Sequence, residues 1–192
     1  LAGTQWGRID SLVLRSGAAY AVVVNGADMP SRAQSSAALP MATPWLFQWY
    51  DGARYAALDL PIDDGVRWDI MGQAASLLRD PGGTGPLAGW AVRHVYGSGW
   101  SFLGSTWRSW INYGFHDRFR RADGSPVIDG YLIGISAGSV PAGAVPLNAT
   151  DPVRNRSRDL LRPIDRPVIE LTSEMEAITN VSPQRGDVDT VA

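Results

Sequence analysis

The stretch Gly97-Ser98-Gly99-Trp100-Ser101-Phe102-Leu103-Gly104 decides how this sequence folds. Residues 91–96 precede it and predict a strand. Residues 103–113, which contain no proline, predict a helix that Gly114 ends. A glycine-rich turn from a strand into a helix exposes a serine hydroxyl, and it places the backbone N–H groups of the helix behind that hydroxyl. Ser101 is therefore a candidate nucleophile.

A second serine matches the familiar G-x-S-x-G pattern literally, in Gly134-Ile135-Ser136-Ala137-Gly138. The residues that follow, 139–146, contain two prolines and a glycine, which argue against a helix. A strand that continues into a loop cannot present its hydroxyl at a helix N-terminus. We therefore interpret Ser136 as a serine in a glycine-rich strand exit and prefer Ser101.

The rest of the chain alternates apolar runs with segments of helical spacing, and this order predicts an α/β fold with a mostly parallel sheet and crossover helices. The expected helices are residues 6–16, 66–78 and 103–113, and the expected strands are residues 18–24, 91–96, 127–135 and 168–172. Residues 26–65 lack clean periodicity, and we interpret them as a loop-like or lid-like insertion. No repeat or linker divides the sequence, so we expect one domain over residues 1–192.

Composition excludes several classes of function. Charged residues make up 19% of the chain and the formal net charge is −2, so neither a nucleic acid nor an anionic membrane is an expected partner. The absence of cysteine excludes disulfides, thiol nucleophiles and thiolate metal sites. His94 and His116 are the only two histidines, and we expect neither a metal nor a cofactor. No run is long enough to span a bilayer, and no compartment follows from the sequence.

Several segments together match one known family. They are Gly99-Trp100-Ser101-Phe102-Leu103-Gly104, Asn112-Tyr113-Gly114-Phe115-His116 and Gly124-Ser125-Pro126-Val127-Ile128-Asp129-Gly130, with 54–55 and 64–70 upstream and 166–176 downstream. They resemble the bacterial α/β-hydrolase domain family, whose members carry a G-F-S-Q-S-G turn, a helix that ends in G-F-N, and a P-V-F-D-G motif before a strand. The resemblance covers most of the chain and implies an α/β-hydrolase fold.

The resemblance also implies roles for individual residues. Ser101 is then the nucleophile, and the backbone N–H of Phe102 is one oxyanion donor. The catalytic acid lies just beyond the last strand, where Glu176 occupies the family's aspartate position and Glu174 is the neighbouring alternative. Either would orient a histidine, and the implied activity is carboxylic ester hydrolysis through an acyl-enzyme. The chain departs from the family where Phe102 and Leu103 replace Gln and Ser, which makes the turn bulkier and more apolar.

The histidine that this mechanism needs is missing from the sequence. In this fold it follows the acid in chain order, and no histidine follows Glu176. We expect His94 to lie inside the strand before Ser101 and His116 at the end of the helix after it, both in structural roles. Because the chain also begins within a segment of helical spacing, we expect a fragment without the N-terminal strands and the C-terminal histidine region. Hydrolysis is then expected of the intact parent and not of this chain alone.

Two alternative functions remain open from the sequence. The first is a catalytically dead α/β-hydrolase homologue that acts as a binding or structural module, and the bulky Phe102 and Leu103 favour it. The second is a nucleotide-binding protein, because Gly97-Ser98-Gly99 before a helix resembles a phosphate-binding turn. The G-x-G-x-x-G spacing fails at Phe102, however, and no lysine exists for a P-loop.

The eight tryptophans indicate an aromatic core and, near the candidate serine, an apolar pocket. Trp100 stands beside Ser101, and we place it near the substrate. The expected partner is therefore a small-molecule ester with an apolar acyl or alcohol group.

Overall fold

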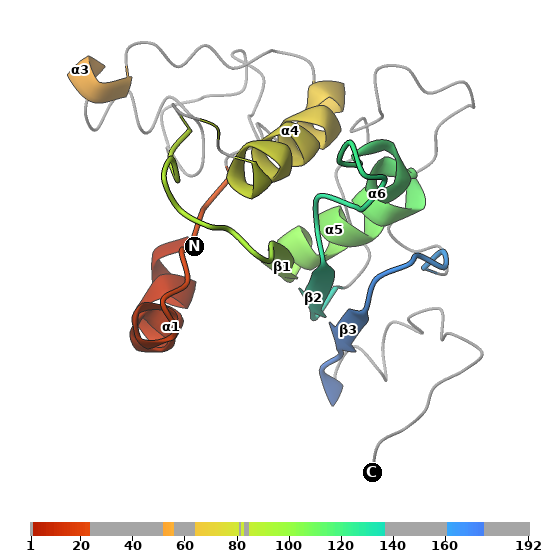
Figure 1. The fold of residues 1–192 in the computed structure, drawn as a ribbon. Helices are drawn as coiled ribbons and strands as arrows, with labels where there is room; N and C mark the ends of the chain where they lie inside the picture. Colours follow the sequence, from red (N-terminus) through yellow and green to blue (C-terminus); the bar gives the residue numbers. More distant parts are fainter. Residues whose placement is uncertain are drawn as a thin grey trace.

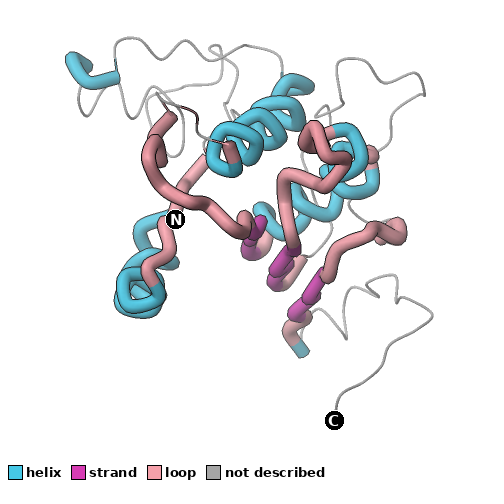
Figure 2. Tube along the Cα trace, viewed as in Figure 1, coloured by secondary structure: helices cyan, strands magenta, loops and turns pink. Residues whose placement is uncertain are grey.

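The computed structural model describes residues 2–23, 52–55, 64–80, 82, 85–136 and 161–174. Their centre is a three-stranded sheet in the order β1 (Tyr96–Trp100), β2 (Gly130–Gly134) and β3 (Val168–Leu171), with both strand pairs parallel. Helix α5 (Phe102–Asn112) follows β1 in the chain and packs against both β1 and β2 (Figures 1 and 2). A parallel sheet with a crossover helix confirms the predicted α/β fold.

The other elements are helical. They are α1 (Ala2–Ser16), α3 (Gly52–Tyr55), the 3₁₀ turn η1 (Asp64–Val66), α4 (Arg67–Arg79) and α6 (Phe115–Arg118). Helix α6 contacts both α5 and α4, and Figure 1 shows α1 standing apart from the sheet. In the part of the chain that the structure describes, no helix has the length and apolar character needed to cross a membrane.

Two tryptophans form the centre of the hydrophobic core. Trp68 of α4 and Trp110 of α5 are completely buried, and Trp110 Nε1 donates a hydrogen bond of 3.0 Å to the backbone oxygen of Trp68. Tyr131 and Ile133, which alternate along β2, and Phe115 of α6 belong to the same core. The packing of the two buried indole rings joins α4 to α5. The hydrogen bond from Trp110 Nε1 means that this ring N–H is not left without an acceptor.

The opposite face of the sheet is apolar and exposed in the described structure. Its members are the exposed large side chains Tyr96, Trp100, Leu132, Ile169 and Leu171. Residues of β1 alternate between the two faces, so Gly97 and Gly99 lie on the buried side. The α5 side therefore carries the core that positions the strands.

The sequence predicted the helices more closely than the strands. The predicted helices 6–16, 66–78 and 103–113 correspond to α1, α4 and α5, whereas α6 was not predicted. The strand predicted over 91–96 is wrong except at Tyr96, since β1 runs through the glycines that follow. Glycine has no side chain from which a strand can be predicted. Here the glycines of β1 are required by the close packing of α5 against the strand. The strand predicted over 127–135 shortens to β2, and 168–172 corresponds to β3.

Residues 18–23 do not form the predicted strand. They belong to neither a strand nor a helix, and five of the six are exposed. A strand depends on a hydrogen-bonding neighbour as much as on its own apolar residues, and among the described residues 18–23 have none in the sheet. Residue 24 lies outside the described residues, as does most of the insertion predicted over 26–65, so that prediction and the single-domain prediction remain predictions.

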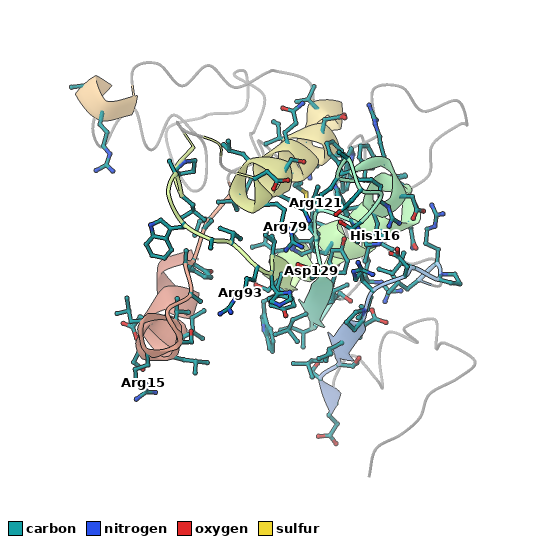
Figure 3. All side chains as sticks on the ribbon, in the orientation of Figure 1. Arg15, Arg79, Arg93, His116, Arg121 and Asp129 are labelled. Carbon is teal, nitrogen blue, oxygen red and sulfur yellow. The ribbon has the colours of Figure 1, made fainter. Side chains whose placement is uncertain are left out.

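Asp129 fixes the N-terminal ends of β1 and β2 against each other. Its carboxylate accepts hydrogen bonds from Arg79 of α4 at 2.5 Å and from the N–H of Val95 at 2.9 Å, while its own N–H donates to the Val95 oxygen at 2.7 Å. Arg79 also donates to the backbone oxygen of Arg93 at 2.6 Å. Figure 3 shows Arg79, Arg93 and Asp129 gathered beside the sheet. One charged pair therefore sets the relative position of α4 and two strands.

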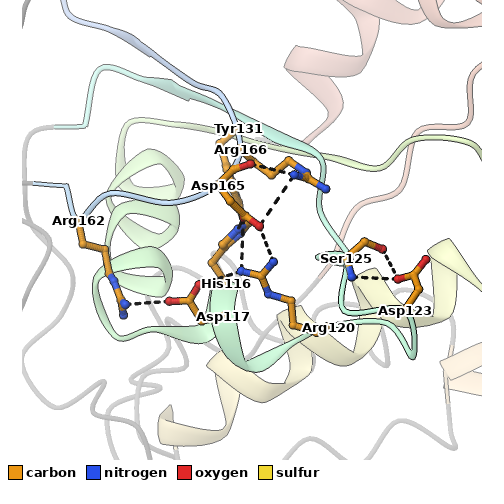
Figure 4. Close-up of polar contacts among 9 residues, drawn as sticks. All are labelled: His116, Asp117, Arg120, Asp123, Ser125, Tyr131, Arg162, Asp165 and Arg166. Carbon is orange, nitrogen blue, oxygen red and sulfur yellow. Dashed lines mark hydrogen bonds and ion pairs between the residues drawn. The ribbon is translucent and has the colours of Figure 1, made fainter.

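A second polar network holds the segment that leads into β3. The buried ring of His116 contacts the Tyr131 hydroxyl through Nδ1 at 2.8 Å and the Asp165 carboxylate through Nε2 at 2.7 Å. Arg120 pairs with both Asp165 and Asp117, at 2.6 and 2.9 Å (Figure 4). A neutral imidazole satisfies both contacts, because Tyr131 can donate to Nδ1 while Nε2–H donates to Asp165.

The pKa values of both His116 and Asp165 in this network are lowered. Burial lowers the pKa of His116, although the hydrogen bond to Asp165 opposes this shift. The hydrogen bonds from Arg120 and from His116 hold the pKa of the Asp165 carboxyl well below its usual range. At neutral pH the network therefore contains a neutral imidazole and a charged carboxylate.

We expect the free energy of unfolding to decrease as the pH is lowered from 7.5 to 5.5. Because the folded pKa of His116 is below the value of about 6.5 in the unfolded chain, the unfolded chain binds the proton first, with a slope of at most about 1.4 kcal/mol per pH unit. Urea unfolding at several pH values measures the slope, and His116→Gln should remove it. A wild-type stability that is constant or rises toward pH 5.5 would contradict this assignment.

Candidate functional site

Ser101 lies directly between β1 and α5, at the strand-to-helix turn that the sequence predicted. Its φ is 57° and its ψ is −122°, a combination that non-glycine residues rarely adopt. Its backbone N–H donates a hydrogen bond of 2.8 Å to the backbone oxygen of Gly134. Its backbone oxygen accepts a hydrogen bond of 3.0 Å from the N–H of Ser105. The neighbouring strand and the first turn of α5 therefore hold an exposed serine in a strained conformation.

Two glycines allow this sharp turn. A Cβ atom on Gly99 would collide with the carbonyl group of Leu103, and a Cβ atom on Gly104 would lie 2.7 Å from the oxygen of Gly134. Helix α5 thus crosses the ends of β1 and β2 at a distance that only glycine permits. Leu103 is 45% exposed. Its departure from the small residue of the family therefore does not obstruct the turn.

The start of α5 supplies backbone donors next to the serine. Phe102 is the first residue of α5, and the first N–H groups of a helix have no acceptor inside the helix. The N–H of Ser101 itself is engaged by Gly134. The N–H of Phe102 is thus the first backbone donor after the serine, and its role at an oxyanion remains a prediction.

The three strands end at the same level. Trp100 pairs with Gly134, and Gly134 pairs with Leu171, so the residues just beyond the strands share one edge of the sheet. Neighbouring strands lie about 4.8 Å apart, which separates the Ser101 backbone from the end of β3 by about 10 Å. This gap is wide enough for one side chain to act between a residue at β1 and a residue at β3.

Of the two candidate acids, the structure describes one. Glu174 lies three residues beyond β3, is exposed, and stands at the same sheet edge as Ser101. Glu176 lies outside the described residues. Glu176 and Glu174 therefore remain alternative predictions for the catalytic acid.

Trp100 belongs to the exposed face of the sheet. Its side chain is on the face opposite α5 and is 44% exposed. Its ring occupies the place where a Cβ atom on Gly134 would be. The ring therefore covers the last paired residue of β2, and its contact with a substrate remains a prediction.

Neither histidine lies beside Ser101. The prediction that His94 lies inside a strand is wrong, because it precedes β1 and its side chain is 62% exposed, with Nδ1 3.7 Å from the Asp129 carboxylate. His94 is thus at the N-terminal end of β1, and a five-residue strand of about 16 Å separates it from Ser101. His116 is in α6 rather than at the end of α5, and Tyr131 and Asp165 occupy both its nitrogens, in keeping with a structural role.

Ser136, which carries the literal pattern, follows β2 at the same edge of the sheet. Its Cβ atom is 3.2 Å from the position that a Cβ atom on Gly104 would take. The residues after Ser136 lie outside the described residues, so the loop predicted there remains a prediction. In the part of the chain that the structure describes, no cluster of three potential ligands suits a metal ion.

A parallel sheet whose first described strand enters a helix through a strained serine has the architecture of an α/β hydrolase. A family model described as an alpha/beta hydrolase domain matches residues 2–191, and the chain belongs to this family. No curated protein and no solved structure matches the chain. Membership of this family supports a hydrolase function.

The importance of Gly104 was not predicted from the sequence. Leu103 is the residue that differs from the small residue of the family, whereas the close contact falls on the next residue, Gly104. One signal was present, because a glycine inside a helix costs about 1 kcal/mol relative to alanine and so indicates a packing constraint.

We expect Gly104→Ala to lower the free energy of unfolding by about 1–3 kcal/mol, because the added methyl group overpacks the contact with Gly134. This would reverse the gain of up to about 1 kcal/mol that alanine brings to a helix. Leu103→Ala, at an exposed position of the same helix, should change stability by less than about 1 kcal/mol. Urea unfolding of both variants measures the difference, and a stabilised Gly104→Ala would show that α5 does not approach the strands closely.

Proposed function

We propose that the protein is a serine hydrolase that cleaves carboxylic esters through an acyl-enzyme, with Ser101 as the nucleophile. The observation that carries this proposal is the strained backbone of Ser101, at φ 57° between a parallel strand and a helix. In α/β hydrolases a turn of this kind raises the serine hydroxyl above the strand ends and aims the N-terminus of the following helix at the same point. Family membership supports the same chemical class.

In the proposed mechanism Ser101 Oγ attacks the carbonyl carbon of the ester. A histidine takes the hydroxyl proton, and the N–H of Phe102 stabilises the negative oxygen of the tetrahedral intermediate. Collapse of the intermediate breaks the bond to the alcohol, which leaves with the proton from the histidine. Water then attacks the acyl-Ser101 ester by the same route and releases the acid. Glu176 or Glu174, beyond β3, would orient the histidine.

The base in this mechanism is not one of the two histidines described above. His94 is at the wrong end of β1, and His116 is occupied in its own network. A serine without a base keeps the pKa of an ordinary alcohol and is a poor nucleophile at neutral pH. The proposal therefore requires a histidine from sequence beyond these 192 residues.

We propose an ester with an apolar group next to the scissile bond as the substrate. The exposed ring of Trp100 and the exposed side chain of Leu171 support this choice, because both lie at the strand ends.

A second candidate function is a catalytically inactive binding module. The absence of a histidine beside Ser101 among the described residues favours it. The two functions differ in one property, the reactivity of the Ser101 hydroxyl, and a covalent probe can measure that property.

We expect a fluorophosphonate probe to label Ser101 in the product of the complete reading frame that encodes these residues. Ser101→Ala should abolish labelling and lower ester hydrolysis by at least about 10⁴-fold, because it removes the nucleophile. Ser136→Ala, in the literal G-x-S-x-G pattern, is the matched control and should keep both the labelling and the ester hydrolysis. Mass spectrometry of the labelled peptide identifies the site, and a folded protein that is not labelled would support the binding module instead.

The 192-residue chain assayed alone should hydrolyse p-nitrophenyl acetate no faster than its Ser101→Ala variant, because no base reaches the hydroxyl. Circular dichroism of the purified chain checks that it is folded. Ser101-dependent turnover by this chain would contradict the assignment of His94 and His116 to structural roles.

A further inference from the structure

The peptide group between Gly134 and Ile135 is the point where the candidate site is joined to the rest of the sheet. Its oxygen accepts the N–H of Ser101 at 2.8 Å, and its N–H donates to the oxygen of Leu171 at 2.7 Å. The same oxygen is the atom that a side chain on Gly104 would strike. This one peptide group therefore contacts the serine turn, the start of α5 and the end of β3.

Ile135 follows this peptide group with an unusual backbone. Its φ is 37°, and Ser101 is the only other non-glycine residue with a positive φ in the described structure. A β-branched side chain makes this conformation especially unfavourable, whereas glycine would adopt it freely. Both strained residues come directly after paired strands, and the pairing of Trp100 with Gly134 puts them on neighbouring strands at the same level.

The positive φ changes the direction of the Ile135 side chain. Tyr131 and Ile133 face the core on the α5 side of β2, and regular alternation would place Ile135 there as well. Instead Ser136 comes next to Gly104 of α5. Ile135 is half-buried, and it is not among the described side chains that pack against the core. Ile135 follows the last residue of β2, so it lies at the same sheet edge as Ser101.

We propose that Ile135 determines substrate specificity, and that its side chain borders the space above the Ser101 hydroxyl and contacts the first carbons of an apolar acyl chain. The inference rests on the proposed function of Ser101. Ligands of open parallel sheets bind at the carboxyl ends of the strands, which is where Ile135 lies. An isoleucine retained in a conformation that glycine would adopt without strain indicates that the side chain itself has a use there.

The test compares acyl chains of different length in the product of the complete reading frame. Ile135→Ala should lower kcat/KM for p-nitrophenyl hexanoate relative to p-nitrophenyl acetate by about tenfold, because it removes apolar contact with the longer chain only. Ile135→Val, which loses one methyl group, should shift the same ratio toward acetate by about two- to threefold. Leu132→Ala is the matched control, because Leu132 lies on the same strand, on the exposed face and away from the edge.

The outcomes separate the two proposals. If hydrolysis depends on Ser101 but the ratio changes less than about twofold in Ile135→Ala, or changes equally in Leu132→Ala, the specificity role is wrong and the proposed function stands. If the wild-type protein shows no Ser101-dependent hydrolysis, both are wrong. Should Ile135→Ala fail to fold by circular dichroism, an unchanged ratio in folded Ile135→Val overturns the specificity role, and a shift toward acetate supports it.

Discussion

The close approach of α5 to the ends of β1 and β2 is the constraint on which the candidate site depends. It exists because Gly99 and Gly104 have no Cβ atom where the helix crosses the strands. The helix can then begin immediately after the strand, and Ser101 takes up the whole change of direction in its own backbone. A conformation of this kind costs about 1–3 kcal/mol and persists only where the surroundings fix it. Here the hydrogen bonds to Gly134 and from Ser105 fix it from both sides.

The level strand ends at this edge follow from contacts at the other end of the sheet and on its covered face. Asp129 holds the start of β2 to the segment before β1, and His116 with Asp165 holds the segment before β3 to α6. Arg108 of α5, which is almost completely buried, pairs with Glu170 of β3. A buried cation is costly without its partner, so this pair fixes β3 to the helix that carries the serine turn. The site is therefore positioned by charges that lie away from it.

The sequence predicted the parts of this fold that follow from local pattern. Helical spacing located α4 and α5 within about one residue, and the order of elements predicted the parallel sheet. The strand before Ser101 was placed too early, because its residues are mostly glycines selected by packing against α5 and not by strand propensity. The strand predicted over 18–24 failed at its described residues 18–23 for the complementary reason, since their apolar character is typical of a strand but they do not belong to the described sheet. Long-range contacts decided both cases.

The same distinction explains why the prediction of Ser101 rests on its context and not on the spelling of the pattern at Ser136. A serine turn needs glycines because the helix crosses the strands closely and leaves no room for a Cβ atom. Any spacing of glycines that leaves room at these crossing points satisfies this steric requirement. Here the two positions are Gly99 and Gly104, and Leu103 between them is exposed. The strain bears on the choice between an enzyme and a binding module as well. A glycine in place of Ser101 would form the turn without strain, so a binding module would gain stability by losing the serine. A serine in this conformation is therefore an argument for hydroxyl chemistry, even though the base that would activate it is not among the described residues.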